Sequence, residues 1–180
     1  KFYAERNKLK ILNIRLANAA GQGETNTKLL GTIITQLKTG IVRLGNLTPR
    51  RDFIHIDDIA WVITEFIYRN KFNKKISCDF LNLGTGYKPI SVREVFERIV
   101  KIYPKKIILK KDIKRIRKID RELLAPNTKK LFKLLPDFKP KKINEWLPTL
   151  VENPNFRISN RMQKIIDKKY GIYSKKIPTY

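Results

Sequence analysis

Arg51-Asp52-Phe53-Ile54-His55-Ile56-Asp57-Asp58-Ile59-Ala60 brings three local signals together in one short segment. An Arg-Asp pair comes first, an alternating apolar run follows over 53–56, and two carboxylates then open a helical pattern. The alternation predicts a short strand, and we expect Asp57 or Asp58 to cap the helix that follows. A strand that leads directly into a helix is typical of an α/β fold.

Strands and helices alternate on both sides of this segment. We expect further strands at 11–16, 41–44, 80–83 and 107–109, and helices at 1–8, 27–39, 59–67, 91–103, 127–135, 143–151 and 159–169. Small residues at 17–23 predict a loop after the first strand, and 113–121 is too charged to assign. Gly84-Thr85-Gly86 indicates a tight turn, because the third glycine of a dinucleotide-binding loop is missing.

The net charge of +24 over 180 residues has two interpretations. A polyanion such as nucleic acid is one partner that would suit it. The other interpretation is a Lys- and Ile-rich composition together with one small anionic ligand. Lys outnumbers Arg about two to one and is scattered along the chain, whereas nucleic-acid readers favour Arg. The composition therefore favours the second interpretation and leaves the first as an alternative.

The rarest residues exclude several classes of protein. Cys78 is the only cysteine, so it cannot form an internal disulfide, and we expect a buried thiol in a protein of the reducing cytoplasm. His55 is the only histidine, which leaves no Ser-His-Asp set and no Cys/His cluster for zinc. We interpret it as structural. No apolar run reaches the roughly 18 residues that span a membrane.

Three polar residues are candidates for binding a ligand. Asn18 follows the first predicted strand, where an open α/β sheet places ligands, although it could equally be a turn residue. Arg51 could hold a diphosphate through two parallel hydrogen bonds, or it could form a surface pair with Asp52. Arg117 and Asp120 repeat the order of a basic and an acidic residue, in surroundings that are crowded with charge.

These motifs resemble a known family when they are taken in order. The series runs through the residues Lys1-Phe2-Tyr3-Ala4-Glu5, Arg15-Leu16-Ala17-Asn18-Ala19-Ala20-Gly21, Leu44-Gly45-Asn46-Leu47, 51–60 and Asn82-Leu83-Gly84-Thr85-Gly86. It resembles the C-terminal half of the extended short-chain dehydrogenase/reductases, and most closely their NAD-dependent nucleotide-sugar epimerases and dehydratases. The likeness covers about residues 1–135, and the residues from Asn155 onward match nothing.

The resemblance implies a role for five residues. Lys1 takes the place of the lysine in the family's Tyr-x-x-x-Lys pair, which holds the nicotinamide ribose and lowers the pKa of the tyrosine. Leu16 falls at a position that lines the cofactor, NAD or NADP. Asn18 takes the place of an asparagine that contacts substrate. Arg51 and Arg117 fall on two arginines that grip the diphosphate of a nucleotide sugar.

The resemblance also implies a fold and a chemistry. The fold would be the C-terminal portion of a Rossmann-type doubly wound parallel sheet plus a small α/β substrate-binding lobe, with the N-terminal dinucleotide-binding half absent. We expect residues 1–20 and 51–103 in the cofactor domain, 21–50 and 104–154 in the substrate lobe, and 155–180 in a basic C-terminal helix and tail. The reaction would transfer a hydride from C4 of the sugar to NAD⁺, giving a 4-keto intermediate of an epimerase or a 4,6-dehydratase.

Two features limit that expectation. Neither the glycine-rich dinucleotide loop nor the catalytic tyrosine is present, and the only methionine is Met162. We therefore expect a segment of a longer enzyme that is inactive by itself, and NAD or NADP would be bound mainly by the missing half. The alternatives are a truncated non-catalytic remnant and a basic nucleic-acid-binding module. A homodimer stays open for the full-length enzyme.

Overall fold

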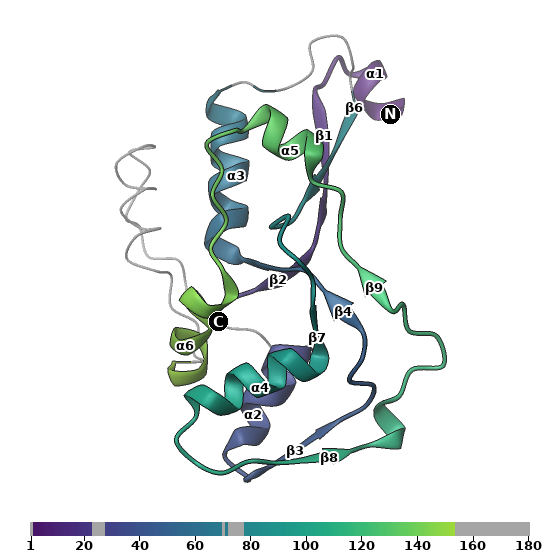
Figure 1. The fold of residues 1–180 in the computed structure, drawn as a ribbon. Helices are drawn as coiled ribbons and strands as arrows, with labels where there is room; N and C mark the ends of the chain where they lie inside the picture. Colours follow the sequence, from purple (N-terminus) through teal and green to yellow (C-terminus); the bar gives the residue numbers. More distant parts are fainter. Residues whose placement is uncertain (1, 23–27, 70, 72–77, 154–180) are drawn as a thin grey trace, which may run out of the picture.

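The structure is a computed structural model that describes residues 2–22, 28–69, 71 and 78–153 (Figure 1). Its helices are α1 (Phe2–Arg6), α2 (Leu29–Leu37), α3 (Ile56–Tyr68), α4 (Val92–Ile102), α5 (Lys129–Leu134) and α6 (Ile143–Glu152), with a short 3₁₀ helix, η1 (Ile113–Arg115). Its strands are β1 (Ile11–Leu16), β2 (Asn18–Ala20), β3 (Ile41–Leu44), β4 (Arg50–Arg51), β5 (Phe53–His55), β6 (Cys78–Leu83), β7 (Ile90–Ser91), β8 (Ile108–Lys111) and β9 (Leu123–Leu124).

Most of the strand pairs are parallel, which confirms the predicted fold class. β1 pairs with β6, β2 with β5, β3 with β8 and β4 with β9, all in parallel, whereas β4 and β7 are antiparallel. Parallel strands need crossover connections, and the chain supplies them as helices. The result is a mixed α/β fold of the Rossmann-like type.

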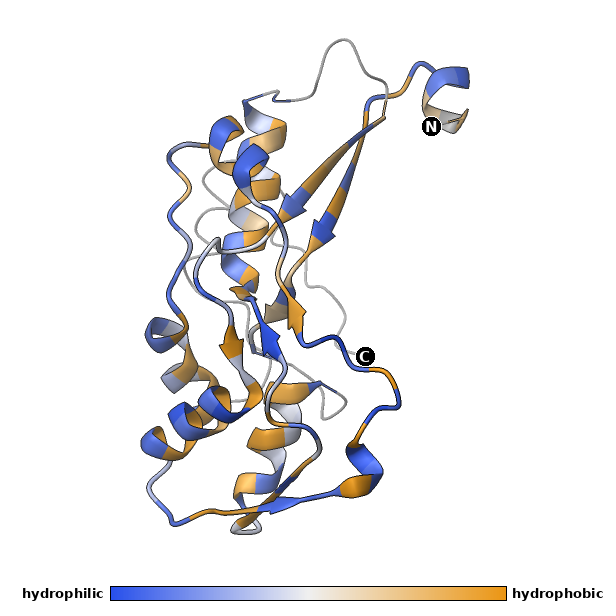
Figure 2. Ribbon diagram, turned by 45° about the vertical axis from the view of Figure 1, so that its right-hand side comes forward, coloured by the Kyte–Doolittle hydropathy of each residue, from blue (hydrophilic) through white to orange (hydrophobic). Residues whose placement is uncertain are grey.

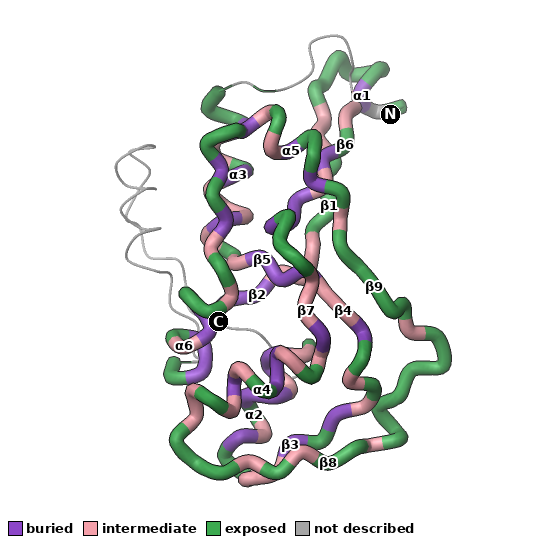
Figure 3. Tube along the Cα trace, in the orientation of Figure 1, coloured by how far each residue is buried: buried purple, intermediate pink, exposed green. Residues whose placement is uncertain are grey.

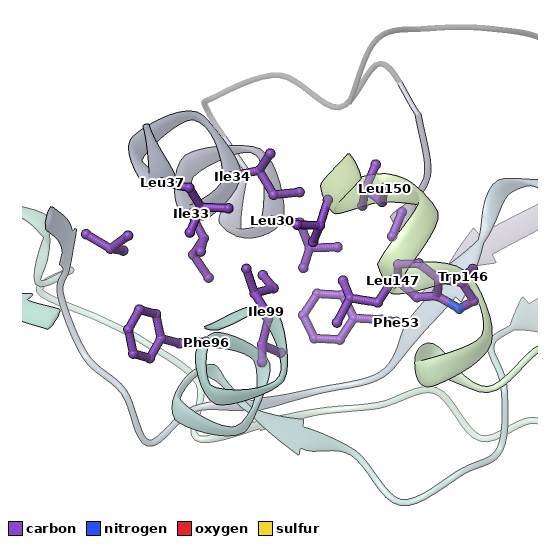
Figure 4. Packing of buried hydrophobic residues seen from close by; sticks show 14 of the residues in the cluster. Leu30, Ile33, Ile34, Leu37, Phe53, Phe96, Ile99, Trp146, Leu147 and Leu150 are labelled. Atoms are coloured by element: carbon purple, nitrogen blue, oxygen red, sulfur yellow. The ribbon is translucent and has the colours of Figure 1, made fainter. Parts of the chain in front are cut away.

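Two hydrophobic clusters hold the fold together. In the first cluster, α2, α4 and α6 pack against one another, and Ile33, Ile99 and Leu147 are fully buried among them (Figure 4). In the second cluster, α3 and α5 cover the β1–β6 pair. Figures 1 and 3 show the two groups at opposite ends of the molecule, with β2, β4, β5 and β7 between them. We expected α4 to lie with residues 51–103 in the cofactor domain. It packs in the first cluster, with α2 and α6.

The helices form where the apolar spacing predicts them. α4 begins at a capping box, since Ser91 Oγ accepts from the Glu94 amide at 3.1 Å and Glu94 Oε2 accepts from the Ser91 amide at 2.7 Å. α2 is followed by Gly40, whose φ is +72°. In α3, Val62 and Phe66 are buried as expected, but Ile67 at the same predicted face is 58% exposed.

The structure corrects five details. Residues 18–20, which we expected to be part of a loop, form strand β2. The strands β4, β7 and β9 are not predicted, and 113–115 is a 3₁₀ helix. Cys78 is half-buried, whereas we expected a buried thiol. His55 rather than Asp57 or Asp58 caps α3. The predicted helix at 159–169 lies outside the described residues.

Candidate functional site

Arg51 lies in β4 and directs its guanidinium at the segment that leads into β9. Its Nη1 donates to the carbonyl oxygens of Arg50 at 2.9 Å and Arg121 at 2.8 Å. Its Nη2 donates to Asp120 Oδ1, also at 2.8 Å. The side chains of Arg51 and Asp120 are only 15% and 20% exposed, so this ion pair is largely shielded from water.

The guanidinium of Arg51 keeps part of its hydrogen-bonding capacity. An arginine has five N–H donors, and three of those in Arg51 are used by the contacts with Arg50, Arg121 and Asp120. The Nε–H and one N–H of Nη2 have no partner among the described residues. Arg51 can therefore bind an anionic oxygen without giving up the contacts that orient it.

Asp52 does not form the surface pair with Arg51 that the sequence left open. Its side chain points away from that of Arg51, because successive residues of a strand face opposite sides. Asp52 is 4% exposed, and its carboxylate accepts from the hydroxyl and the amide of Thr85 at 2.5 and 2.9 Å. The chain bends at Gly84 and again at Tyr87, and Gly86 has a φ of +72°.

Asn18 lies in β2 beside β5, so its interpretation as a turn residue is wrong. Its backbone amide donates to the Asp52 carbonyl at 3.0 Å, and its Nδ2 donates to the same oxygen at 3.2 Å. The side-chain carbonyl of Asn18 and its second N–H have no partner among the described residues. Asn18 is thus bonded to the residue that directly follows Arg51, and these two candidates come together.

Arg117 lies between η1 and β9, on an exposed segment from 112 to 121. No hydrogen bond or ion pair joins it to another described residue, and Asp120 pairs with Arg51 instead. Figure 3 shows that this segment is largely exposed, and Figure 2 shows that hydrophilic and hydrophobic residues alternate in it. Its start is held by a bond from the Asp112 amide to the Leu44 carbonyl at 2.8 Å.

Of the two residues that we assign to the cofactor, only Leu16 lies among the described residues. Leu16 ends β1, pairs in register with Leu83 of β6 and is 50% exposed. An exposed leucine at the carboxyl end of a parallel strand suits packing against a ligand ring. Lys1 lies outside the described residues, so its assignment stays a prediction.

His55 is a structural residue in the described geometry. Its Nδ1 accepts from the Asp57 amide at 3.2 Å, which caps α3, and its ring lies 5.5 Å from that of Trp146. Burial lowers the pKa of His55 from its usual 6.5, while Asp57 opposes that change and Lys141 adds to it. Because Nδ1 accepts a hydrogen bond, the neutral ring carries its proton on Nε2.

The sequence does not predict two contacts of this region. The Asp52–Thr85 bonds and the Arg51–Asp120 ion pair join residues 33 and 69 positions apart. Gly84-Thr85-Gly86 was recognised as a turn, but no local signal says which carboxylate the turn would bind. Among residues 2–22, 28–69, 71 and 78–153, no His, Cys, Asp and Glu side chains gather into a group that could hold a metal ion. None of the helices in these ranges is long and apolar enough to cross a bilayer.

We compared the chain with protein families, curated proteins and solved structures. Residues 1–77 match the NAD dependent epimerase/dehydratase family. No curated protein matches the chain. Among solved structures, UDP-glucuronic acid 4-epimerase from Bacillus cereus, in complex with UDP-glucuronic acid and NAD, is 18% identical, with a TM-score of 0.70. The match covers 85% of this chain and 48% of that one.

Two further solved structures share the fold. dTDP-glucose 4,6-dehydratase from Bacillus anthracis, in complex with NAD, is 21% identical with a TM-score of 0.66, covering 84% of this chain and 46% of the other. RMD from Pseudomonas aeruginosa, complexed with NADPH, is 16% identical with a TM-score of 0.72, covering 87% and 52%. The chain thus spans about half the length of these structures. Residues 1–77 thus match the model of the NAD dependent epimerase/dehydratase family, and the described chain shares a Rossmann-like α/β fold with the solved epimerase and dehydratase structures.

Proposed function

We propose that this chain binds the diphosphate of a nucleotide sugar, as part of an NAD(P)-dependent epimerase or 4,6-dehydratase that works through a 4-keto intermediate. The observation that carries the proposal is the geometry of Arg51. Its guanidinium is held by two backbone carbonyls and Asp120, and it still has two N–H groups to offer. A preorganised guanidinium is the group best suited to bind a diphosphate through parallel hydrogen bonds.

The surroundings of Arg51 support an anionic ligand. Arg117 and Lys118 lie on the exposed segment whose Asp120 pairs with Arg51, and neither has an ion-pair partner among the described residues. Asn18, one hydrogen bond from Asp52, offers an amide carbonyl and an N–H that suit sugar hydroxyls. We assign the diphosphate to Arg51 and Arg117 and the sugar to Asn18.

The cofactor assignment rests on fewer residues. Leu16 fits an apolar contact with a nicotinamide ring, since it is apolar, half exposed and at the end of a parallel strand. Lys1 would hold the nicotinamide ribose. When bound, NAD or NADP would supply the hydride acceptor for C4 of the sugar. The residues of this chain would bind and orient the sugar nucleotide for that chemistry.

Calorimetric titration of the 180-residue chain with UDP-, GDP-, CDP- and dTDP-glucose tests the proposal. We expect one of the four to bind, and Arg51→Ala to weaken that binding roughly 10- to 100-fold, because hydrogen bonds to charged groups contribute about 1.5–3 kcal/mol. Arg51→Lys should recover only part of the loss, because an ammonium lacks the planar fork.

An arginine at the C-terminal end of α3 provides the control. Arg69 donates to two carboxylates, Glu65 and Asp137, and it lies outside the proposed site. Arg69→Ala should leave nucleotide affinity unchanged. Absence of binding to all four nucleotides, or equal affinities for wild type and Arg51→Ala, would remove the proposal.

The exposed basic segment at 112–121 supports one alternative function, the binding of nucleic acid. Lys114, Arg115, Arg117 and Lys118 could contact the phosphates of a nucleic acid instead. That function requires DNA or RNA affinity that falls steeply as salt rises through about 0.1 M. Undetectable binding of a 20-mer duplex at that salt would exclude it. The cytoplasmic location, a homodimer of the full-length enzyme and the division into cofactor and substrate regions remain proposals.

A further inference from the structure

Asp52 is a buried carboxylate at the junction of the segments that carry the proposed site. Its backbone carbonyl accepts both N–H bonds from Asn18, and its own amide donates to the Leu124 carbonyl of β9 at 3.4 Å. Arg51 directly precedes it in the chain. The orientation of this one residue therefore affects Asn18, Arg51 and the end of β9 together.

Thr85 holds the side chain of Asp52 in place. The Thr85 hydroxyl donates to Asp52 Oδ1 at 2.5 Å, and it accepts from the Tyr87 amide at 3.1 Å. The Thr85 amide donates to Asp52 Oδ2 at 2.9 Å. Thr85 is 3% exposed, so water cannot replace these bonds without opening the turn. A buried carboxylate with such partners is held in one orientation.

Gly84 allows the carboxylate to approach the turn. A Cβ at position 84 would lie 2.4 Å from Asp52 Oδ2 and 2.6 Å from Pro126 Cγ. Either distance is shorter than a normal carbon contact, so any other residue at position 84 would require the Asp52 carboxylate and the Pro126 ring to shift. Gly84 thus leaves room for the Asp52 carboxylate, and Thr85 donates two hydrogen bonds to it.

We propose that Asp52 and Thr85 are positioning residues for the nucleotide-sugar site, an inference that rests on the proposed function above. The Thr85 bonds set the direction of the Asp52 carboxylate, and with it the direction of the Asp52 carbonyl. That carbonyl fixes the side-chain amide of Asn18. The same constraint sets the strand direction at Arg51, on the opposite face of β4. Neither Asp52 nor Thr85 needs to contact the ligand.

Removal of the Thr85 hydroxyl tests this role. In Thr85→Val, we expect the backbone and side-chain N–H groups of Asn18 to exchange with solvent about tenfold faster, as measured by NMR. We also expect the dissociation constant for the bound glucose nucleotide to rise about tenfold, and Thr85→Ser to restore both values. Thr128 is the matched control: it is 8% exposed, near the same turn, and its hydroxyl has no hydrogen-bond partner among the described residues. Thr128→Val should change neither value.

The two readouts separate the two proposals. Unchanged exchange at Asn18 in Thr85→Val, or equal acceleration in Thr128→Val, would overturn the positioning role even if the wild type binds a nucleotide sugar. If the wild type binds none of the four nucleotides, the proposed function fails, and exchange at Asn18 alone judges the positioning role. If Thr85→Val does not fold, amide hydrogen exchange at Asn18 and Thr85 in the wild type tests the positioning role instead. The amides of Asn18 and Thr85 should then share one opening free energy, and clearly different values would refute the link.

Discussion

The Arg51–Asp120 ion pair should stabilise the fold more than an ion pair of the same length at the surface. Arg51 Nη2 and Asp120 Oδ1 are 2.8 Å apart, and their side chains are 15% and 20% exposed. Arg69 Nη1 and Asp137 Oδ2 are also 2.8 Å apart, but Asp137 is 65% exposed. The two pairs therefore differ in shielding from water and not in length, which makes the second a matched control for the first.

The expected size of the effect follows from that shielding. Two unit charges about 4 Å apart attract by about 1 kcal/mol in water and about 4 kcal/mol at an effective dielectric constant of about 20. Desolvation of both groups takes back part of the larger value. We therefore expect a coupling energy of about 1.5–2 kcal/mol for Arg51 and Asp120. The coupling for the exposed pair should be far smaller.

Two double-mutant cycles measure these energies. Urea unfolding of the wild type, Arg51→Ala, Asp120→Ala and the double variant gives the first coupling energy, and the same set at Arg69 and Asp137 gives the second. Fluorescence and circular dichroism should report coincident transitions, which justifies two-state treatment. Raising the salt to about 1 M should weaken the first coupling less than the second. Equal couplings for the two pairs would refute the shielding of Arg51.

Three further predictions concern the stability of the fold. Because the folded pKa of His55 lies below 6.5, the unfolded chain binds more protons near that pH, so stability should fall on acidification below about pH 6.5; His55→Asn should flatten that slope in urea titrations at several pH values. Gly86→Ala should cost about 2–4 kcal/mol in urea unfolding, because its φ is +72° and the new Cβ would lie 2.8 Å from Phe132 Cε2. Gly40→Ala, with the same φ and nothing within 4 Å, should cost only about 1 kcal/mol, and equal costs would contradict the steric reasoning. Ser91→Ala should lower the free energy of unfolding by about 1 kcal/mol, because it removes the cap of α4. A melting temperature equal to that of the wild type would disprove the contribution of the cap.

Much of the secondary structure was predictable from local patterns. The apolar residues of α2 and α4 recur at helical spacing, and the Ser91 capping box marks the first residue of α4. The alternation at 53–56 predicted β5 to within one residue. Such signals lie within a few neighbouring positions, where backbone geometry alone decides which side chains share a face.

The shortest strands were beyond such reasoning. β4, β7 and β9 have two residues each, too few to show any period. They exist because Arg50 pairs with Ser91 on one side and with Leu123 on the other. A strand of this length forms only when its neighbours are already in place, and those neighbours are tens of residues away.

By itself, the sequence determined the α/β class, the helices with strong apolar spacing, and the order of the motifs around Asn18 and Arg51. The tertiary structure decided which partners these motifs have. Asp52 is buried against Thr85, and Arg51 forms its ion pair with Asp120 rather than with Asp52. The physical reason is range. Backbone periodicity acts over a few residues, whereas the choice of one carboxylate for one guanidinium depends on where packing of the whole chain brings distant segments together.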